Sequence, residues 1–439
     1  MTNPLSRKLH WYILASIVPA ALICTICRGF GVQGGSFAKG LLWVCDFGGG
    51  LFLRALKMVI VPLVATSIIS GMLSLGGARN FGKISLGVFT YYFATTLAAV
   101  LMGLGLVNII RPGDVSPETA KVILGNAANG QHIADKLQSH GTGDLVDFFQ
   151  RMIPDNIVNV ASDNGQLLGL IVFCLIFGFF ISKLPPDKRE FQDKLWNSLQ
   201  DVMMLVTQWI IAFSPIGVFC LIVPVMMRTG LDIIMPLFWF FVTVMLGLFL
   251  HMFGTLSLLL WRVGHINPLR HLRTMLPVLI TSFSTSSSSA TLPVTMETVE
   301  KDAGVSNRIS CFVLPLGATV NMDGTALYEC VVVIFIAQFY GAMQGFEISL
   351  STQFIIALLA LLTSVGVAGI PSASLVAIAL ILGYVGLPLE SIGIIWLTDR
   401  ILDMCRTSVN VYGDTCGAVI IARLTGEKGV YPDMPKAEA

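Results

Sequence analysis

A group of five polar or ionisable residues at helical spacing lies on a segment with the length and apolar content of a membrane-spanning helix. Within 397–419 these are Asp399, Asp403, Arg406, Asn410 and Asp414. Because successive residues of an α-helix are rotated by about 100°, these spacings place all five on one face. An ionisable group at the bilayer centre costs at least about 2.5 kcal/mol on insertion scales. The face must therefore turn toward a protein interior or an aqueous cavity, which indicates a transporter or a channel.

Arg406 and Asp403 have the side chains that recognise a zwitterion with a second negative group. The guanidinium can bind a carboxylate through two parallel hydrogen bonds, and the aspartate one turn earlier can hold an ammonium group. Asp399 can orient or neutralise Arg406 in the empty site, and Asn410 and Asp414 add oxygen ligands. The alternative is a self-compensated salt bridge that only fastens helices, because buried charges generally have partners.

A second polar group interrupts the apolar segment 309–339. Asn321 and Asp323, beside a helix-breaking glycine, offer the amide, carboxylate and carbonyl oxygens that an alkali cation needs. The four-residue spacing predicts that Asn321, Thr325 and Glu329 share a helix face. Burial of Glu329 without a basic partner favours its protonated form, so it is a candidate proton carrier. A polar helix seam, or a glutamate that reaches the membrane surface, is the alternative.

Two apolar stretches, 274–296 and 353–384, are broken by small residues. The first contains a serine run at 284–289 followed by Ala-Thr-Leu-Pro, and the second contains two glycines and a proline within 363–372. Such breaks are expected of re-entrant hairpins buried in protein. Backbone N–H groups at a hairpin tip can receive a carboxylate, and glycine hinges suit a lid. The alternative for the first stretch is a linker or a packing seam between helices. The alternative for the second stretch is a kinked helix.

The composition is that of a polytopic membrane protein. Of 439 residues, 55% are hydrophobic and 12% are charged, whereas a soluble domain has about 25% charged residues. The net charge of +1 leaves no basic excess to attract nucleic acid. An intramembrane enzyme would need a nucleophile with a base or a metal cluster, and neither is visible: no histidine lies in or after the serine-rich stretch. We expect no enzymatic activity.

Eight apolar segments are long enough to span a bilayer, at 11–29, 51–76, 84–110, 166–183, 199–228, 231–261, 309–339 and 390–422. If they alternate, the basic residues of the short loops fall on one side, which we assign to the cytoplasm together with both termini. The acidic segment 111–165 then lies outside. The two broken stretches enter from opposite sides, each before a helix with a polar centre, which is typical of an inverted repeat.

In order and spacing, the motifs resemble the dicarboxylate/amino acid:cation symporter family, which includes bacterial and archaeal glutamate/aspartate transporters and animal excitatory amino acid transporters. The resemblance rests on the serine run, NMDGT at 321–325, AGIP at 368–371 and the string 403–414. It covers essentially the whole chain. It implies an all-α membrane fold with eight transmembrane helices and two re-entrant helical hairpins in inverted repeats. It further implies a homotrimer in the cell (inner) membrane, with a scaffold and a mobile elevator transport domain.

The resemblance also implies a division of the chain. The expected parts are scaffold helices 1 and 2 at 1–76, transport-domain helix 3 at 77–110, an external loop at 111–165, scaffold helices 4 and 5 at 166–230, transport-domain helix 6 at 231–273, the transport core at 274–424 and a cytoplasmic tail at 425–439.

By matching positions, the resemblance implies contacts to substrate and ions. The substrate contacts would be Ser287, Ser288, Thr325, Gly369, Ile370, Asp403, Arg406, Thr407 and Asn410. Three sodium sites would comprise Gly317, Asn321, Asn410 and Asp414; Thr319, Ser364, Val365 and Val367; and Tyr92, Thr95, Thr96, Asn321 and Asp323. Glu329 matches the glutamate assigned to proton carriage in the animal branch. Relatives of both branches carry a further arginine at one of two positions that are Ser286 and Met404 here, and this departure leaves potassium counter-transport open.

We therefore expect a secondary active symporter that imports glutamate or aspartate with sodium, with or without protons. Its partners would be an acidic amino acid, sodium and the lipid bilayer, and not nucleic acid. A C4-dicarboxylate or cystine carrier of the same family, a carrier coupled to protons alone and an ion channel are the alternatives. A C4-dicarboxylate needs no ammonium partner, so Asp403 argues against the first of these. The pairing of Asp403 with Arg406 in mid-span looks like a binding site and argues against a channel.

Overall fold

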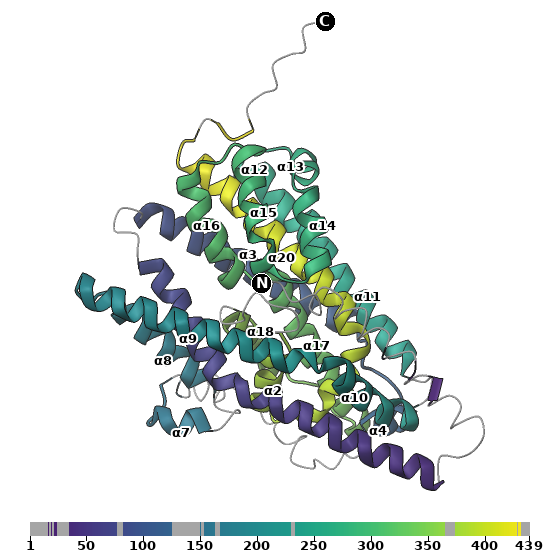
Figure 1. The fold of residues 1–439 in the computed structure, drawn as a ribbon. Helices are drawn as coiled ribbons and strands as arrows, with labels where there is room; N and C mark the ends of the chain where they lie inside the picture. Colours follow the sequence, from purple (N-terminus) through teal and green to yellow (C-terminus); the bar gives the residue numbers. More distant parts are fainter. Residues whose placement is uncertain are drawn as a thin grey trace, which may run out of the picture.

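The regular structure of the described chain is helical, as predicted. The computed structural model describes residues 16, 19, 22, 23, 35–76, 82–124, 150, 153–162, 167–229, 233–364, 374–427 and 429–431. Within these ranges the helices form an extended layer on one side and a compact bundle on the other, and no strand occurs (Figure 1). A helix satisfies its backbone hydrogen bonds within one segment, as a lipid environment requires.

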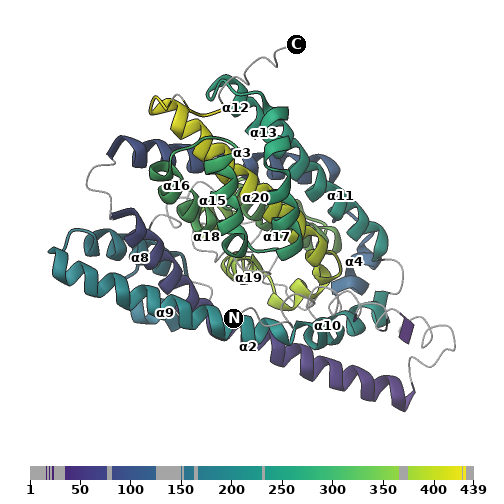
Figure 2. The ribbon, with the colours of Figure 1, turned by 45° about the horizontal axis from the view of Figure 1, so that its top comes forward.

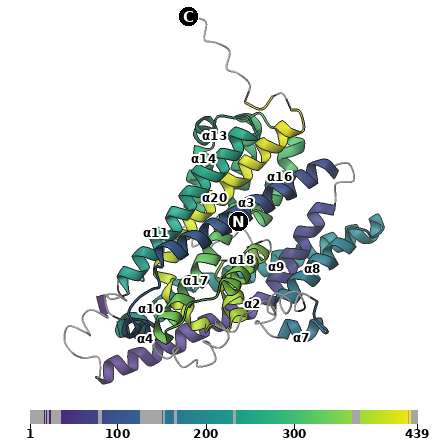
Figure 3. The same ribbon diagram turned by 180° about the vertical axis from the view of Figure 1, so that it is seen from behind.

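Four helices form the extended layer, in which α2 packs against each of the others. They are α2 (Ser36–Gly76), α8 (Leu167–Ile181), α9 (Pro186–Ala212) and α10 (Ser214–Thr229). Figure 2 shows this layer beneath the bundle, and Figure 3 shows it from behind. Many of its apolar side chains are exposed, among them Trp43, Phe47 and Trp209. An apolar surface of this kind suits contact with lipid or with other subunits.

Helix α2 begins 15 residues before the predicted start at 51. The glycines at 48–50 lower the expected helix propensity there, but tertiary packing outweighs that cost. A Cβ atom at Gly48 would lie 2.9 Å from Cys220 Sγ, and one at Gly49 would lie 2.9 Å from Leu221 Cδ2. The glycines therefore allow α2 and α10 to approach closely, which is how small residues act between membrane helices.

The bundle is centred on α17 (Asp323–Gln344), which is buried along almost its whole length. A helix that is apolar on all sides is expected inside a bundle. Around α17 lie α3 (Gly82–Ile110), α4 (Pro117–Leu124), α11 (Ile234–Leu250), α18 (Leu350–Ser364), α19 (Ser374–Val385) and α20 (Trp396–Leu424). After α11 the chain continues through the π-helical turn His251–Leu256 into α12 (Ser257–Arg262). Two further short elements are α7 (Ile157–Ser162) and the 3₁₀ helix Leu389–Ile394.

The predicted single helix at 309–339 is broken. Helix α16 (Asn307–Val320) ends before Asn321, and α17 begins after Met322. The prediction that Asn321 shares a helix face with Thr325 and Glu329 is therefore wrong. The physical reason is that the Asn321 side chain donates a hydrogen bond to Asp414 of α20, while its backbone leaves the helical region at ψ 83°. Asparagine commonly exchanges helix continuation for such side-chain bonds.

The serine-rich stretch forms a helical hairpin. Helix α13 (Pro268–Thr274) leads into α14 (Leu276–Thr285), which packs against α15 (Ser288–Lys301). The turn uses Ser286 in the left-handed region at φ 49°, and the Ser287 hydroxyl caps α15 by accepting the Ala290 N–H at 3.2 Å. Both helices pack against α20. The second broken stretch gives α18 and α19, which pack against each other, and the residues between them lie outside the described ranges.

By length and composition, the described helices include three that could each cross a membrane, at Leu86–Ile110, Ile234–Arg262 and Asn307–Gln344. Helices α9 and α10, bent by 51°, would make a fourth together. This agrees with a multi-pass membrane protein. The predicted total of eight spans stays a prediction, in part because most of the segment 11–29 lies outside the described residues.

Candidate functional site

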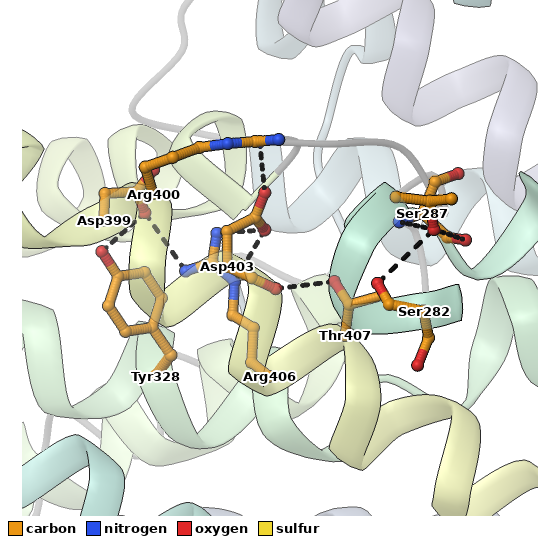
Figure 4. A network of polar contacts seen from close by, with 9 residues as sticks. Ser282, Ser287, Tyr328, Asp399, Arg400, Asp403, Arg406 and Thr407 are labelled. Atoms are coloured by element: carbon orange, nitrogen blue, oxygen red, sulfur yellow. Dashed lines mark hydrogen bonds and ion pairs between the residues drawn. The ribbon is translucent and has the colours of Figure 1, made fainter. Parts of the chain in front are cut away.

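Four charged side chains of α20 form one buried network (Figure 4). Arg406 donates from Nη2 and Nε to Asp403 Oδ1 at 2.7 and 3.1 Å, and from Nη1 to Asp399 Oδ1 at 3.2 Å. Arg400 donates from Nη1 to Asp403 Oδ2 at 3.2 Å. All four are at most 5% exposed. Two guanidinium groups and two carboxylates balance in charge, which is the condition under which buried charges are tolerated.

Tyr328 of α17 fixes the position of this network. Its hydroxyl donates to Asp399 Oδ1 at 2.8 Å, and its ring lies 4.1 Å from the Arg406 guanidinium carbon. The ring face attracts the cation, and the hydroxyl bond holds the carboxylate that pairs with it. Arg406 is therefore held on several sides by other side chains of the protein. Such preorganisation lowers the entropy cost of gripping a carboxylate.

The hairpin of α14 and α15 brings its serines beside this part of α20. Ser282 Oγ lies 3.3 Å from Ser408 Oγ, and Figure 4 shows Ser282 and Ser287 on the side of the network where Thr407 lies. Thr407 donates its hydroxyl to the Asp403 carbonyl at 2.7 Å. The predicted contacts Ser287 and Ser288 are buried at the turn of the hairpin. The hairpin turn, Thr407 and the charged network thus form one polar region.

A second polar cluster surrounds the break between α16 and α17. Asp323 Oδ1 accepts the hydroxyls of Thr96 at 2.6 Å and Thr95 at 3.3 Å, both from α3. Its Oδ2 lies 3.0 Å from His251 Nε2. Asn321 Nδ2 donates to Asp414 Oδ1 at 2.8 Å. In the described part of the chain neither Asp323 nor Asp414 forms an ion pair with a lysine or an arginine.

Gly317 brings a third element against this cluster. A Cβ atom there would lie 2.4 Å from Asp414 Oδ1 and 2.6 Å from Tyr92 Oη, so only glycine fits. Tyr92 Oη donates to the carbonyl of Val313, one turn earlier on α16. The cluster contains two buried carboxylates, and amide, hydroxyl and carbonyl oxygens lie nearby. Such oxygen atoms are hard ligands, which an alkali cation prefers. A cation would supply positive charge that no lysine or arginine of the described residues provides to these carboxylates.

Asn410 links the two regions. Its Oδ1 accepts the Gly324 N–H at 2.7 Å, and its Nδ2 donates to Thr325 Oγ1 at 3.0 Å and to Met322 Sδ at 3.3 Å. It lies one turn after Arg406 and one turn before Asp414 on α20. Asn410 therefore connects the helix break to the charged network.

Glu329 lies deeper in the bundle, on α17. It is completely buried, and its Oε2 accepts the hydroxyl of Thr363 on α18 at 2.8 Å. Its Oε1 has no hydrogen-bond partner among the described residues. A buried carboxyl oxygen without a donor is costly when charged, and a proton would remove most of that cost.

The remaining predicted positions are not joined to these clusters by described contacts. The hydroxyls of Thr319 and Ser364 bond within their own helices, to Leu316 O at 3.0 Å and to Leu361 O at 2.9 Å. Four further predicted positions lie outside the described residues: Val365, Val367, Gly369 and Ile370. The described part also contains no group of three or more His, Cys, Asp or Glu side chains arranged for a metal ion.

Sequence reasoning missed three residues of the site. Arg400 could have been found from its three-residue spacing to Asp403, which pairs opposite charges on a helix. His251 stands alone in a long apolar segment, and an ionisable residue there is a functional candidate by default. Tyr328 gave no signal, because an aromatic residue in an apolar helix is usually only part of the core.

Comparison with known proteins identifies the family. A sequence model of the sodium:dicarboxylate symporter family matches residues 9–424. Excitatory amino acid transporter 3 of Mus musculus is 35% identical over 95% of this chain and 86% of its own length. Excitatory amino acid transporters of Caenorhabditis elegans and Onchocerca volvulus are 34% and 33% identical, each over 93% of this chain and over 87% and 89% of their own lengths. The chain is a membrane transporter of the symporter type and not an enzyme, as predicted, and it belongs to the sodium:dicarboxylate symporter family.

Proposed function

We propose that the protein imports an acidic amino acid, glutamate or aspartate, together with sodium. The observation that carries the proposal is the buried pair of Arg406 and Asp403 at 2.7 Å. The guanidinium offers a bidentate site for the side-chain carboxylate of the substrate, and the aspartate offers an acceptor for its ammonium group. The names of the relatives, which are excitatory amino acid transporters, support this class of substrate.

Sodium would bind at the cluster around Asp323 and Asp414, where the buried negative charge has no lysine or arginine partner among the described residues. Sodium is a cargo of the transport cycle. Through Asn410, which bonds to Gly324 and Thr325, cation binding would order groups beside the substrate site. Coupling of this kind is a linkage of binding free energies, so each ligand raises the affinity for the other.

The transport step would be an elevator movement. The hairpin of α14 and α15, with α17 and α20, would move as a transport domain against a scaffold of α2, α8, α9 and α10. The packing of α2 against α8, α9 and α10 supports this division. The proposal also includes eight membrane spans in inverted repeats and assembly as a homotrimer. The protein would lie in the cell (inner) membrane with both termini in the cytoplasm. The exposed apolar side chains of the scaffold layer are consistent with contacts to lipid and subunits.

The proposal is tested by uptake of radiolabelled substrates into proteoliposomes with sodium, proton and potassium gradients imposed separately. We expect a sodium gradient to drive uptake of aspartate or glutamate. Competition by excess unlabelled succinate or cystine tests the related carriers, because succinate lacks the ammonium group that Asp403 would hold. Currents without uptake of labelled substrate would instead indicate a channel.

We predict that Glu329→Gln removes the pH dependence of uptake. Glu329 would carry a proton inward with the substrate, so uptake by the native protein should fall as the external pH rises. Glutamine keeps the shape of the side chain and can still accept the hydrogen bond from Thr363, but it cannot bind and release a proton near neutral pH. Uptake by the variant should be constant from about pH 6 to pH 8, the range in which proton supply changes. Glu347→Gln, at an 80% exposed side chain, is the matched control. An unchanged pH profile in Glu329→Gln would refute proton carriage by this residue.

A further inference from the structure

Arg400 occupies the side of the Asp403 carboxylate that Arg406 leaves open. Arg406 bonds to Oδ1, whereas Arg400 lies 3.2 Å from Oδ2, and Figure 4 shows the carboxylate between the two guanidinium groups. Arg400 is 5% exposed, and its Nε has no hydrogen-bond partner in the described part of the chain. Arginine side chains are mostly exposed and are rarely fully buried unless their charge is paired. Arg400 is unusual because it is buried while one of its donors has no described partner.

The charge of the network depends on this side chain. Asp399 and Asp403 contribute two negative charges, and Arg406 alone contributes one positive charge. Without Arg400 the side chains of this network would together carry a net negative charge within a membrane-embedded domain. A buried carboxylate that loses its partner is strongly destabilised. With Arg400 the substrate-free network is neutral.

The substrate would change this balance at Asp403. An ammonium group is a hydrogen-bond donor with one positive charge, as is the Arg400 guanidinium at Oδ2. The two therefore compete for the same oxygen. Arg406, which holds Oδ1 and is fixed by Asp399 and Tyr328, is not the group that an incoming ammonium would replace.

We propose that Arg400 is a built-in counter-ion for Asp403 in the empty carrier, and that the ammonium group of the substrate replaces it on binding. This inference rests on the proposed function. After substrate release, Arg400 returns to Asp403 and neutralises the network. The empty transport domain can then return across the membrane without carrying a cation from the cytoplasm. Net uptake consequently needs no internal potassium.

The native protein gives the first test, which is independent of any variant. Net sodium-driven uptake of aspartate into proteoliposomes is measured with internal potassium and with internal choline. We expect equal rates. A rate that depends on internal potassium would overturn the proposal. Absence of both sodium-driven uptake and aspartate exchange would instead refute the proposed function, so the two failures are distinguishable.

The variants separate return of the empty carrier from the loaded step. In Arg400→Gln we expect net uptake to fall at least about tenfold more than aspartate exchange, because in exchange the ammonium group of the substrate pairs with Asp403 during every crossing. Arg400→Lys should restore net uptake, since it restores the charge. Arg273→Gln, at an exposed arginine of α13, is the control. Equal loss of exchange and net uptake would indicate a merely structural salt bridge, and unchanged net uptake in Arg400→Gln would also overturn the proposal.

Discussion

Arg406→Cys is expected to cause a large loss of transport of acidic amino acids. The side chain is 1% exposed and bonds to both Asp403 and Asp399. In the proposed complex Arg406 pairs with the side-chain carboxylate of the substrate, and truncating one member of such a buried hydrogen-bonded charge pair costs about 2–5 kcal/mol, which corresponds to a loss of affinity of about 30-fold to several thousandfold. We expect aspartate uptake to fall by that factor in proteoliposomes, and uptake of neutral amino acids such as serine to rise, because the site no longer selects a second carboxylate.

Two comparisons make this result specific. Arg406→Lys retains the positive charge but not the planar fork, so it should recover only part of the affinity. Arg273→Cys introduces the same thiol at an exposed arginine and should transport aspartate normally. Retention of sodium binding by Arg406→Cys would show that the variant is folded. Native aspartate uptake by Arg406→Cys would refute its role in substrate recognition.

Gly317→Ala is expected to weaken sodium binding. The added methyl would overlap Asp414 Oδ1 at 2.4 Å and Tyr92 Oη at 2.6 Å, and Asp414 is only 3% exposed. Overpacking of a filled interior costs about 1–3 kcal/mol, so the sodium concentration for half-maximal uptake should rise by about 5- to 150-fold. Saturating sodium should restore much of the rate, because the charged network around Arg406 is untouched.

The control for this prediction is Gly105→Ala on α3, where an added Cβ would meet no atom within 4 Å. It should show the native sodium dependence. The measurement is initial uptake as a function of external sodium at constant ionic strength. If Gly317→Ala also showed the native sodium dependence, the cluster around Asp414 would not be the sodium site.

The charged face of α20 could be predicted from sequence because its residues lie at helical spacing within one apolar segment. Arg406, Asp403 and Asp399 do form one network, as the spacing indicated. The broken stretch before α15 was also readable, since a serine run before proline disfavours a continuous helix. Both signals are local in sequence.

Contacts between segments that are distant in sequence could not be predicted from such local patterns. The bond from Asn321 to Asp414 ends a helix that apolarity alone would continue, and it joins residues 93 positions apart. His251 reaches Asp323 across 72 positions. Helix α2 extends through three glycines because α10 packs against them, which no local propensity indicates. Thr95 and Thr96 were predicted to lie beside Asp323 only by matching positions to the family. No such prediction came from the periodicity of the sequence.

The most direct test of the account is the sodium dependence of substrate binding. Purified protein is titrated with aspartate and with glutamate by isothermal calorimetry, in sodium chloride and in choline chloride at the same ionic strength. The account predicts much tighter binding of at least one of them in sodium, because cation binding near Asp323 and Asp414 orders Asn410 beside the substrate site. Equal affinity in sodium and choline would contradict it.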